Sequence, residues 1–222
     1  MLAGLFAMAC TANAEDVQIG NASVTLTHPS EFCPLDSDQP ADSRVVTFVQ
    51  GLLAGRNRLL KVYALCNELP KWRSGKTPLL TDMLQFQTVI RMMSRDLSRP
   101  YPRFRKRICD EFRSQGQVIL KKIAPESDKR LAALSEKIKL NRQRLVGVLD
   151  GLGERCYALL LQKIRTETGT TFTQLAVFAP VLVKGKFVFT YLFTPFEESI
   201  GSQPAVRRLR AIEAALERAN VN

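Results

Sequence analysis

The residues that could do chemistry are few and scattered along the chain. His28 is the only histidine among 222 residues, which excludes most Ser–His and Cys–His nucleophile pairs and the common histidine-rich metal sites. Glu197 and Glu198 are adjacent carboxylates, but neighbouring side chains of an extended segment point apart, so they make a poor acid–base pair. Asp36 and Asp38 could bind Ca²⁺ in a loop, yet the spaced ligands and the glycine of an EF-hand are missing.

Two glycine motifs also lack a chemical signature. Gly51 and Gly55 have GxxxG spacing on an expected helix, where close packing is the ordinary reason for small residues. Neither they nor Gly151 and Gly153 are followed by the rest of a phosphate-binding motif. His28 ends an expected strand and is predicted to be a surface or turn residue. We therefore expect no cofactor, no metal and no catalytic activity, with an enzyme of unrecognised type as the last alternative.

Four cysteines outside the N-terminal segment support export. They are Cys33, Cys66, Cys109 and Cys156, and no C-x-x-C pair is present to indicate a redox site or a zinc knuckle. Four cysteines allow three pairings. Because Cys33 follows the first strands and Cys66 ends another strand, we favour Cys33–Cys66, which leaves Cys109–Cys156. Buried free thiols are the alternative.

The first fourteen residues are typical of a secretory signal. They carry no charged side chain and end in the A-x-A cleavage site Ala12–Ala14. A signal normally opens with Lys or Arg, and none stands here; a start further upstream is one explanation. We expect residues 1–14 to be removed and residues 15–222 to form one periplasmic or secreted domain. The alternatives are a lipid anchor at Cys10 and, if the segment is no signal, a cytoplasmic protein.

The chain is strongly basic, and part of the excess is local. It has 32 Lys and Arg against 21 Asp and Glu, a net charge of +11. The run RPYPRFRKR is expected to form a basic contact surface, made of Arg99, Arg103, Arg105, Lys106 and Arg107. A solvated basic face is favoured on composition. If the surface makes a contact, the expected partner is an acidic envelope protein or an anionic lipid head group, and nucleic acid is not expected if the chain is exported. No later stretch approaches about 18 uninterrupted apolar residues, so no transmembrane helix is expected.

Hydrophobic periodicity predicts a mixture of strands and helices. Strands are expected at 17–27 (two, around a turn at Gly20), 59–66, 84–90, 144–150, 156–164, 175–183 and 187–193. Helices are expected at 42–54, 104–122, about 127–143 and from 202 onward, with a short helix or turn at 68–76. Asp42 is expected to cap the first helix, and Pro125 to separate the two middle helices. Because hairpin turns prevail over long crossovers, the expected fold is α+β, with a largely antiparallel sheet and helices packed on it.

The clearest hairpin carries a row of aromatic side chains. Its strands meet at a tight turn at Lys184–Gly185, and the returning strand alternates Phe187, Phe189, Tyr191 and Phe193. This row could line an apolar ligand cleft, but a core beneath the helices is favoured because one face of the sheet must be buried. Trp72 lies beside Arg73 and is expected to be an exposed contact point.

Two runs and the closing helix carry a family resemblance. The runs Asn57–Ile90 and Val181–Phe193, together with the last helix, resemble PsbP/Mog1-like envelope proteins of bacteria over most of residues 17–220. The resemblance implies an α+β fold and a binding or assembly role, and it carries over no functional residues. The helical middle of this chain is longer than the family pattern requires. We therefore expect a non-enzymatic binding or assembly factor for an envelope component, with an apolar small-ligand carrier as the alternative.

Overall fold

The centre of the molecule is a seven-stranded antiparallel sheet. A computed structural model describes residues 12–77, 79–98, 101–134, 138–150, 155–166 and 169–221. The strand order is β3-β4-β5-β9-β8-β7-β6, and β1 pairs with β2 in a separate hairpin. The strands are β1 (Ala12–Ile19), β2 (Ala22–Pro29), β3 (Phe32–Pro34), β4 (Asn57–Leu65), β5 (Met83–Val89), β6 (Ile138–Asp150), β7 (Cys156–Thr166), β8 (Thr171–Val183) and β9 (Lys186–Pro195).

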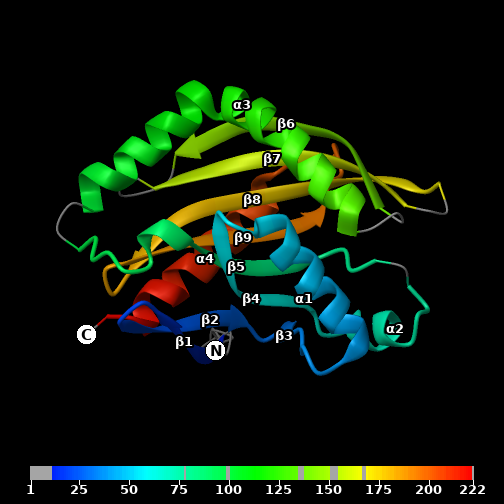
Figure 1. Cartoon of the computed structure of the whole chain (residues 1–222), viewed down its shortest axis with the longest axis horizontal. Coiled ribbons are helices and arrows are strands. Elements are labelled where there is room, and N and C mark those ends of the chain that lie inside the picture. The colour runs from blue at the N-terminus through cyan, green and yellow to red at the C-terminus, as the bar shows by residue number, and fades with distance from the viewer. Residues whose placement is uncertain are drawn as a thin grey trace, which may run out of the picture.

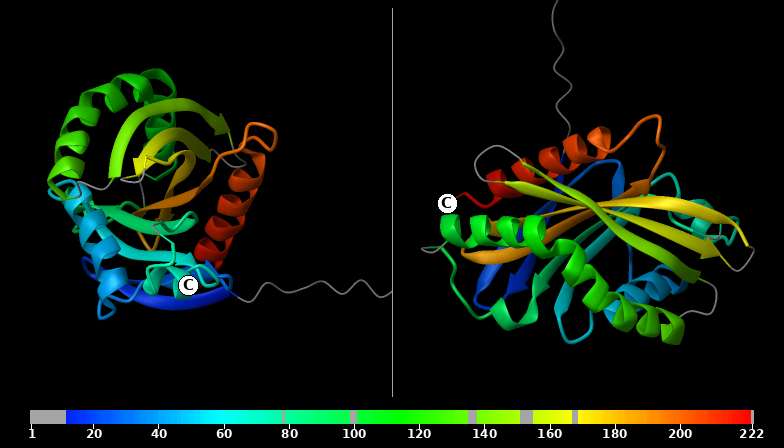
Figure 2. Two further views of the ribbon diagram at one scale, coloured as in Figure 1. Left: turned by 90° about the vertical axis from the view of Figure 1, so that its right-hand side faces the viewer. Right: turned by 90° about the horizontal axis from the view of Figure 1, so that it is seen from above.

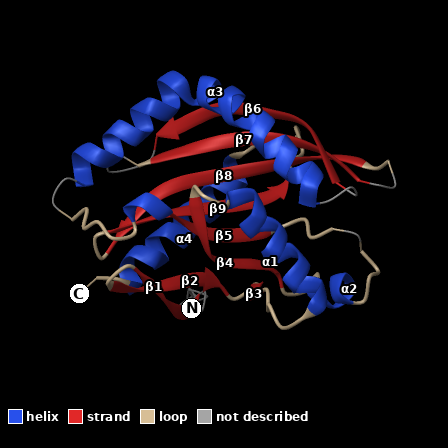
Figure 3. Cartoon of the chain, viewed as in Figure 1, coloured by secondary structure: helices blue, strands red, loops and turns tan. Residues whose placement is uncertain are grey.

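Helices cover both faces of this sheet. They are α1 (Pro40–Leu53), α2 (Leu69–Arg73), the short 3-10 helix η1 (Ile90–Met92), α3 (Tyr101–Leu134) and α4 (Gln203–Ala219). Figure 1 shows α1 and α3 on the near side, with α4 behind the strands. The end view in Figure 2 places α4 on the opposite side of the sheet from α1 and α3, and Figure 3 shows the strands as the layer between them. The predicted α+β fold with a largely antiparallel sheet is confirmed.

The main core lies between the sheet and α4. The apolar stripe of α4 is fully buried, at Val206, Leu209, Ile212 and Leu216. Side chains of the β1–β2 hairpin complete this core from the end of the sheet. Asn220 fixes the hairpin to α4, because its Nδ2 donates to the carbonyl of Thr25 at 2.7 Å and its Oδ1 accepts from the Thr25 amide at 2.9 Å. Each buried aliphatic side chain contributes about 1.5–3 kcal/mol, so this face carries much of the stability.

Most predicted elements form where the sequence pattern indicates. The β8–β9 turn has positive φ at both Lys184 and Gly185, as a type I′ hairpin turn requires and as the right-handed twist of the strands favours. Gly55 has a φ of +77° just after α1 ends, the left-handed position at which glycine stops a helix. Residues 1–11 lie outside the described residues, and Ala12–Ala14 pair with β2.

The middle of the chain differs from the prediction. Pro125 does not end a helix but lies inside α3, which is one helix of 34 residues, bent along its length in Figure 1. Pro125 is exposed, so the carbonyl that loses its helical partner faces water, which lowers the cost of the break. The predicted second helix is wrong from Ile138 onward, because β6 begins there and forms the sheet edge. Edge strands tolerate the charged residues that made this segment resemble an exposed helix.

Two local predictions are also wrong, for reasons of packing. Asp42 does not cap α1: the N-cap residue is Gln39, and Asp42 lies buried in the first turn. β5 was expected to bury one face, yet Gln85 and Gln87 are buried as fully as Leu84 and Phe86. Helices cover both faces of the sheet, so the polar side chains of this central strand are enclosed as well.

Candidate functional site

A cleft of about 500 Å³ separates α1 and α3 from the sheet. Its roof includes Phe48 of α1 and Ile119 of α3, and its floor includes Phe178, Tyr191 and Phe193. Most of the lining side chains are apolar. Ligand pockets of proteins usually measure roughly 300–1,000 Å³ and have mainly apolar walls with a few polar groups. This cleft therefore has the size and the surface of a small-molecule site.

The aromatic row of β9 is divided between core and cleft. Phe187 packs edge-on against Phe104 of α3, with ring centroids 5.6 Å apart. Phe112 of α3 packs in the same way against Phe178 at 5.4 Å. Further along β9, Tyr191 and Phe193 line the cleft instead. The row thus seats the first half of α3 on the sheet and leaves the other rings exposed to the cleft.

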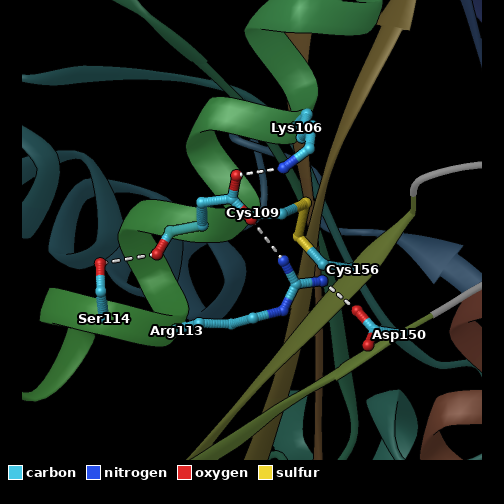
Figure 4. Close-up of polar contacts among 7 residues, drawn as sticks. Lys106, Cys109, Arg113, Ser114, Asp150 and Cys156 are labelled. Atoms are coloured by element: carbon cyan, nitrogen blue, oxygen red, sulfur yellow. Dashed lines mark hydrogen bonds and ion pairs between the residues drawn. A yellow bond between two sulfur atoms is a disulfide. The ribbon is translucent and has the colours of Figure 1, made fainter.

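Covalent and ionic contacts hold α3 to the sheet at one end. Cys109 of α3 and Cys156 at the start of β7 form a disulfide, the pairing expected once Cys33 pairs with Cys66. Figure 4 shows Arg113 one turn further along α3, reaching Asp150 at the end of β6. Arg113 also donates to Asp110 at 2.8 Å. These contacts fix the first part of the roof above β6 and β7.

The far part of α3 is attached to the other roof helix. Arg130 Nη1 donates to the carbonyls of Leu52 at 3.3 Å and Ala54 at 2.6 Å, at the end of α1. A cation there satisfies carbonyls that have no helical partner and complements the negative end of the helix dipole. Arg130 also pairs with Glu126, and this hydrogen bond lowers the pKa of the Glu126 carboxyl. The two roof helices are therefore joined where α1 ends.

A buried ion pair holds the first turn of α1 against α2. Asp42 is 0% exposed, and both of its carboxylate oxygens accept from Arg73, the shortest contact being 2.6 Å. Asp42 Oδ2 also accepts the amide of Asp36 at 3.1 Å. The hydrogen bond to Asp42 raises the pKa of the Arg73 guanidinium. The first turn of α1, where the roof of the cleft begins, is therefore held by the buried Asp42 carboxylate and its partner Arg73.

Arg73→Met is expected to lower the free energy of unfolding by about 3 kcal/mol, because it leaves the buried Asp42 carboxylate without its cation. Asp42→Asn should cost less, since the Arg73 side chain that it leaves is 38% exposed. Adding Asp42→Asn to Arg73→Met should recover part of the loss. Urea unfolding measures all three variants, with Arg44→Met on the exposed side of α1 as the control. Equal losses for Arg73→Met and Arg44→Met would contradict this account.

The floor of the cleft carries two groups of side-chain amides. Gln143, Gln162 and Gln174 are direct partners across β6, β7 and β8, so they form one row on the cleft face. Gln174 Nε2 donates to the carbonyl of Thr81 at 3.2 Å. A second group lies on β4 and β5: Asn57 Nδ2 donates to Gln87 Oε1 at 3.1 Å, and Gln87 Nε2 donates to Gln85 Oε1 at 3.0 Å.

Trp72 and Tyr191 add hydrogen-bond donors to this apolar surface. Trp72 was expected to be an exposed contact point, but it is half-buried and lines the cleft, because α2 packs against α1. Its indole Nε1 is buried and has no hydrogen-bond partner among the described residues. Tyr191 lies on the floor, and burial raises the pKa of its hydroxyl. The phenol therefore stays protonated and able to donate at neutral pH.

The predicted basic contact surface is only partly present. Arg105 does not belong to it, because its side chain is 7% exposed. It lies on the inward side of α3, close enough to Glu213 of α4 to lower the pKa of that carboxyl. Lys106 is exposed but pairs with Asp110 at 2.7 Å, and Arg107 is exposed. Arg99 and the side chain of Arg103 lie outside the described residues.

The other candidate residues are not brought together. His28 is buried rather than at the surface, with its ring 4.3 Å from that of Tyr63, because β4 covers the end of β2. Glu197 and Glu198 are exposed after β9, as expected. Asp36 Oδ1 accepts the amide of Asp38 at 2.9 Å, a local turn. Within the described residues no group of three acids, histidines or cysteines could hold a metal. Gly151 and Gly153 lie outside those residues.

Comparisons with known proteins give distant likenesses of structure. The Saccharomyces cerevisiae Ran-binding protein Mog1p is 12% identical, with a TM-score of 0.31 over 94% of this chain and 91% of that one. A point mutant of the protein Mog1 is 11% identical, with a TM-score of 0.31 over 93% of this chain and 90% of that one. A Pseudomonas aeruginosa protein of unknown function, PA94, is 11% identical, with a TM-score of 0.26 over 89% and 93%. No family model and no curated protein matches the chain.

Proposed function

We propose that this protein binds a small apolar or amphipathic molecule in the cleft beneath α1 and α3, without transforming it. The observation that carries the proposal is the cleft itself, about 500 Å³ with mainly apolar walls. A protein interior is normally close-packed, so a space of this size in a core-like position suggests an occupant. The apolar-ligand alternative drawn from the aromatic hairpin is thereby favoured over the basic contact surface, in which Arg105 is buried.

The lining supports binding rather than catalysis. Among the described residues that line the cleft there is no acid, histidine, cysteine, serine or threonine. General acid–base and nucleophilic catalysis rely on those side chains. Amides, a phenol and an indole offer hydrogen bonds and contact area instead. Arg56 is the only charged residue of this lining, and it is exposed.

An oxidising compartment is part of the proposal. The structure contains the disulfides Cys33–Cys66 and Cys109–Cys156, and such bonds persist mainly in exported proteins. Glu15, the residue after the expected cleavage site, accepts from Tyr63 and pairs with Lys61 at 2.7 Å. Cleavage after Ala14 would keep these contacts. No helix in the described part of the chain is long and apolar enough to cross a membrane. We propose an apolar envelope component, such as a lipid, as the ligand.

Filling the cleft is expected to remove ligand binding. Ile119→Trp places a large ring into the cleft from α3, whereas Val118→Trp places the same ring on solvent, because Val118 is 65% exposed. Fluorescence titration with Nile red, a neutral apolar dye, should give saturable binding to the unaltered protein and to Val118→Trp. Ile119→Trp should weaken it at least about tenfold, the equivalent of about 1.4 kcal/mol.

Two outcomes would contradict the proposal. One is the absence of saturable dye binding to the unaltered protein. The other is equal binding by Ile119→Trp and Val118→Trp, which would place the dye outside the cleft. Thermal unfolding of both variants controls for stability, since an added ring in a packed interior commonly costs about 1–3 kcal/mol.

A further inference from the structure

The amide chain on the cleft floor ends in a donor that is not paired with any described residue. Asn57 donates to Gln87, and Gln87 donates to Gln85, so the side-chain carbonyl oxygens of both glutamines are occupied. The printed contacts of this chain use the Oε1 of Gln85 and leave its Nε2 without an acceptor among the described residues, and Gln85 lines the cleft. Gln85 is 4% exposed and Gln87 is 3% exposed. Because Gln85 lines the cleft, its Nε2 can donate to an acceptor bound there.

Tyr191 places a second donor on the neighbouring strand. Gln85 and Tyr191 are direct partners in the β5–β9 register, so both side chains project from adjacent strands onto the cleft face. The Tyr191 ring is held between Phe178 and Phe193, with centroids 5.0 Å and 6.1 Å away. No hydrogen bond of its hydroxyl to another described residue is present. One amide and one phenol thus stand next to each other in an apolar surround.

The charge of the floor decides which acceptor suits these donors. The single cation among the described lining residues is Arg56, at the exposed rim. A carboxylate bound at the floor would lose its hydration without gaining a cation, which is far more costly than burying a neutral carbonyl. An alkane would leave both donors unpaired. A neutral carbonyl oxygen accepts from both and carries no charge into the cleft.

We infer that the ligand is a neutral long-chain amphiphile, an ester or amide, whose carbonyl oxygen accepts from Gln85 Nε2 and the Tyr191 hydroxyl while its chain fills the cleft. This inference rests on the proposed function, because it presumes that the cleft binds an apolar molecule. It adds the chemical class of the ligand and the two residues that select it.

Displacement of Nile red by three probes of equal chain length tests this inference. The probes are an alkane, the corresponding fatty acid above neutral pH, and its methyl ester, added to the full-length protein. The ester should displace the dye at the lowest concentration. Gln85→Leu and Tyr191→Phe should each weaken ester binding about three- to tenfold, the effect of one neutral hydrogen bond, and leave alkane binding unchanged. Gln115→Leu, which removes an exposed amide of α3 outside the cleft lining, should leave the ester preference intact.

The outcomes separate the two claims. Without saturable dye binding, the proposed function fails and the inference fails with it. If the dye binds but the ester is no better than the alkane or the carboxylate, the ligand class is wrong and the cleft still binds apolar molecules. An ester preference that survives both Gln85→Leu and Tyr191→Phe also overturns the inference. Tyr191→Phe removes a single oxygen, so it tests the contact without disturbing the fold.

Discussion

Removing the Cys109–Cys156 disulfide is expected to abolish ligand binding and to lower the free energy of unfolding by about 4 kcal/mol. The two cysteines are 47 residues apart in sequence, and a loop of that length gives this value when the bond acts by restricting the unfolded chain. Binding should fail because this bond holds α3, half of the cleft roof, to β7. The contacts that remain here are the packing of Phe104 and Phe112 on the sheet and the Arg113–Asp150 pair. That pair joins exposed side chains, and such pairs contribute about 1 kcal/mol at most.

The second disulfide provides the matched control. Cys33 and Cys66 are 33 residues apart and join β3 to the end of β4, at the opposite edge of the sheet from β7. Cys33→Ala/Cys66→Ala should therefore lose a similar free energy of unfolding, about 4 kcal/mol, yet keep Nile red binding. Urea unfolding and dye titration of both double variants, at a temperature where each is folded, measure the two effects. Equal dye binding by the two would show that α3 does not need its tether to form the site.

Stability is expected to fall as the pH rises from about 4.5 to about 7, because of one buried carboxyl on α4. Burial raises the pKa of Glu213 from 4.5 to about 7, although a hydrogen bond from Tyr157 and the nearby cations Arg155 and Arg105 lower it; Glu217 raises it further. The folded protein therefore holds a proton that the unfolded chain releases in this window. One pKa unit corresponds to about 1.4 kcal/mol, so the expected loss is on the order of 3 kcal/mol.

Glu213→Gln should remove this pH dependence. The amide can still accept from Tyr157 but carries no charge at any pH, so the variant should be more stable than the unaltered protein above about pH 7. Below about pH 4.5 the two proteins should be nearly equal. Urea unfolding at several pH values measures the difference, with the exposed Glu198→Gln as the control. A Glu213→Gln variant with the same pH profile as the unaltered protein would assign the dependence to another group.

Local patterns were enough to predict most of the fold. Alternating apolar residues and a positive-φ turn at Lys184–Gly185 specify the β8–β9 hairpin without reference to the rest of the chain. The second middle helix was predicted wrongly because an exposed helix and a charged edge strand have similar compositions. The segment 138–143 was expected to continue a helix, but in the structure it is paired with β7. Only its place in the sheet decides between a helix and a strand for this segment.

The cleft could not be predicted, because its walls come from separate parts of the sequence. The aromatic row on β9 was one signal, and it equally suits a filled core. The space left beneath α3 depends on how closely this helix approaches β6. The two elements are in close contact at Gly116, where an added Cβ atom would collide with Leu145. A second signal was available: Gln85 and Gln87 alternate with Leu84 and Phe86 in a strand that is central to the sheet. Because a buried polar group is costly without a hydrogen-bond partner, two glutamines in a buried strand indicate a site for hydrogen bonding.

The central claim is that the cleft between α1, α3 and the sheet receives an apolar ligand. Its most direct test is an amide-resolved NMR titration of the full-length protein with a long-chain methyl ester. We predict saturable shift changes in α1, α3 and the floor strands, including the side-chain amide of Gln85, with little change in α4. No saturable change, or changes confined to α4 and the exposed face of α3 around Arg107, would contradict the account.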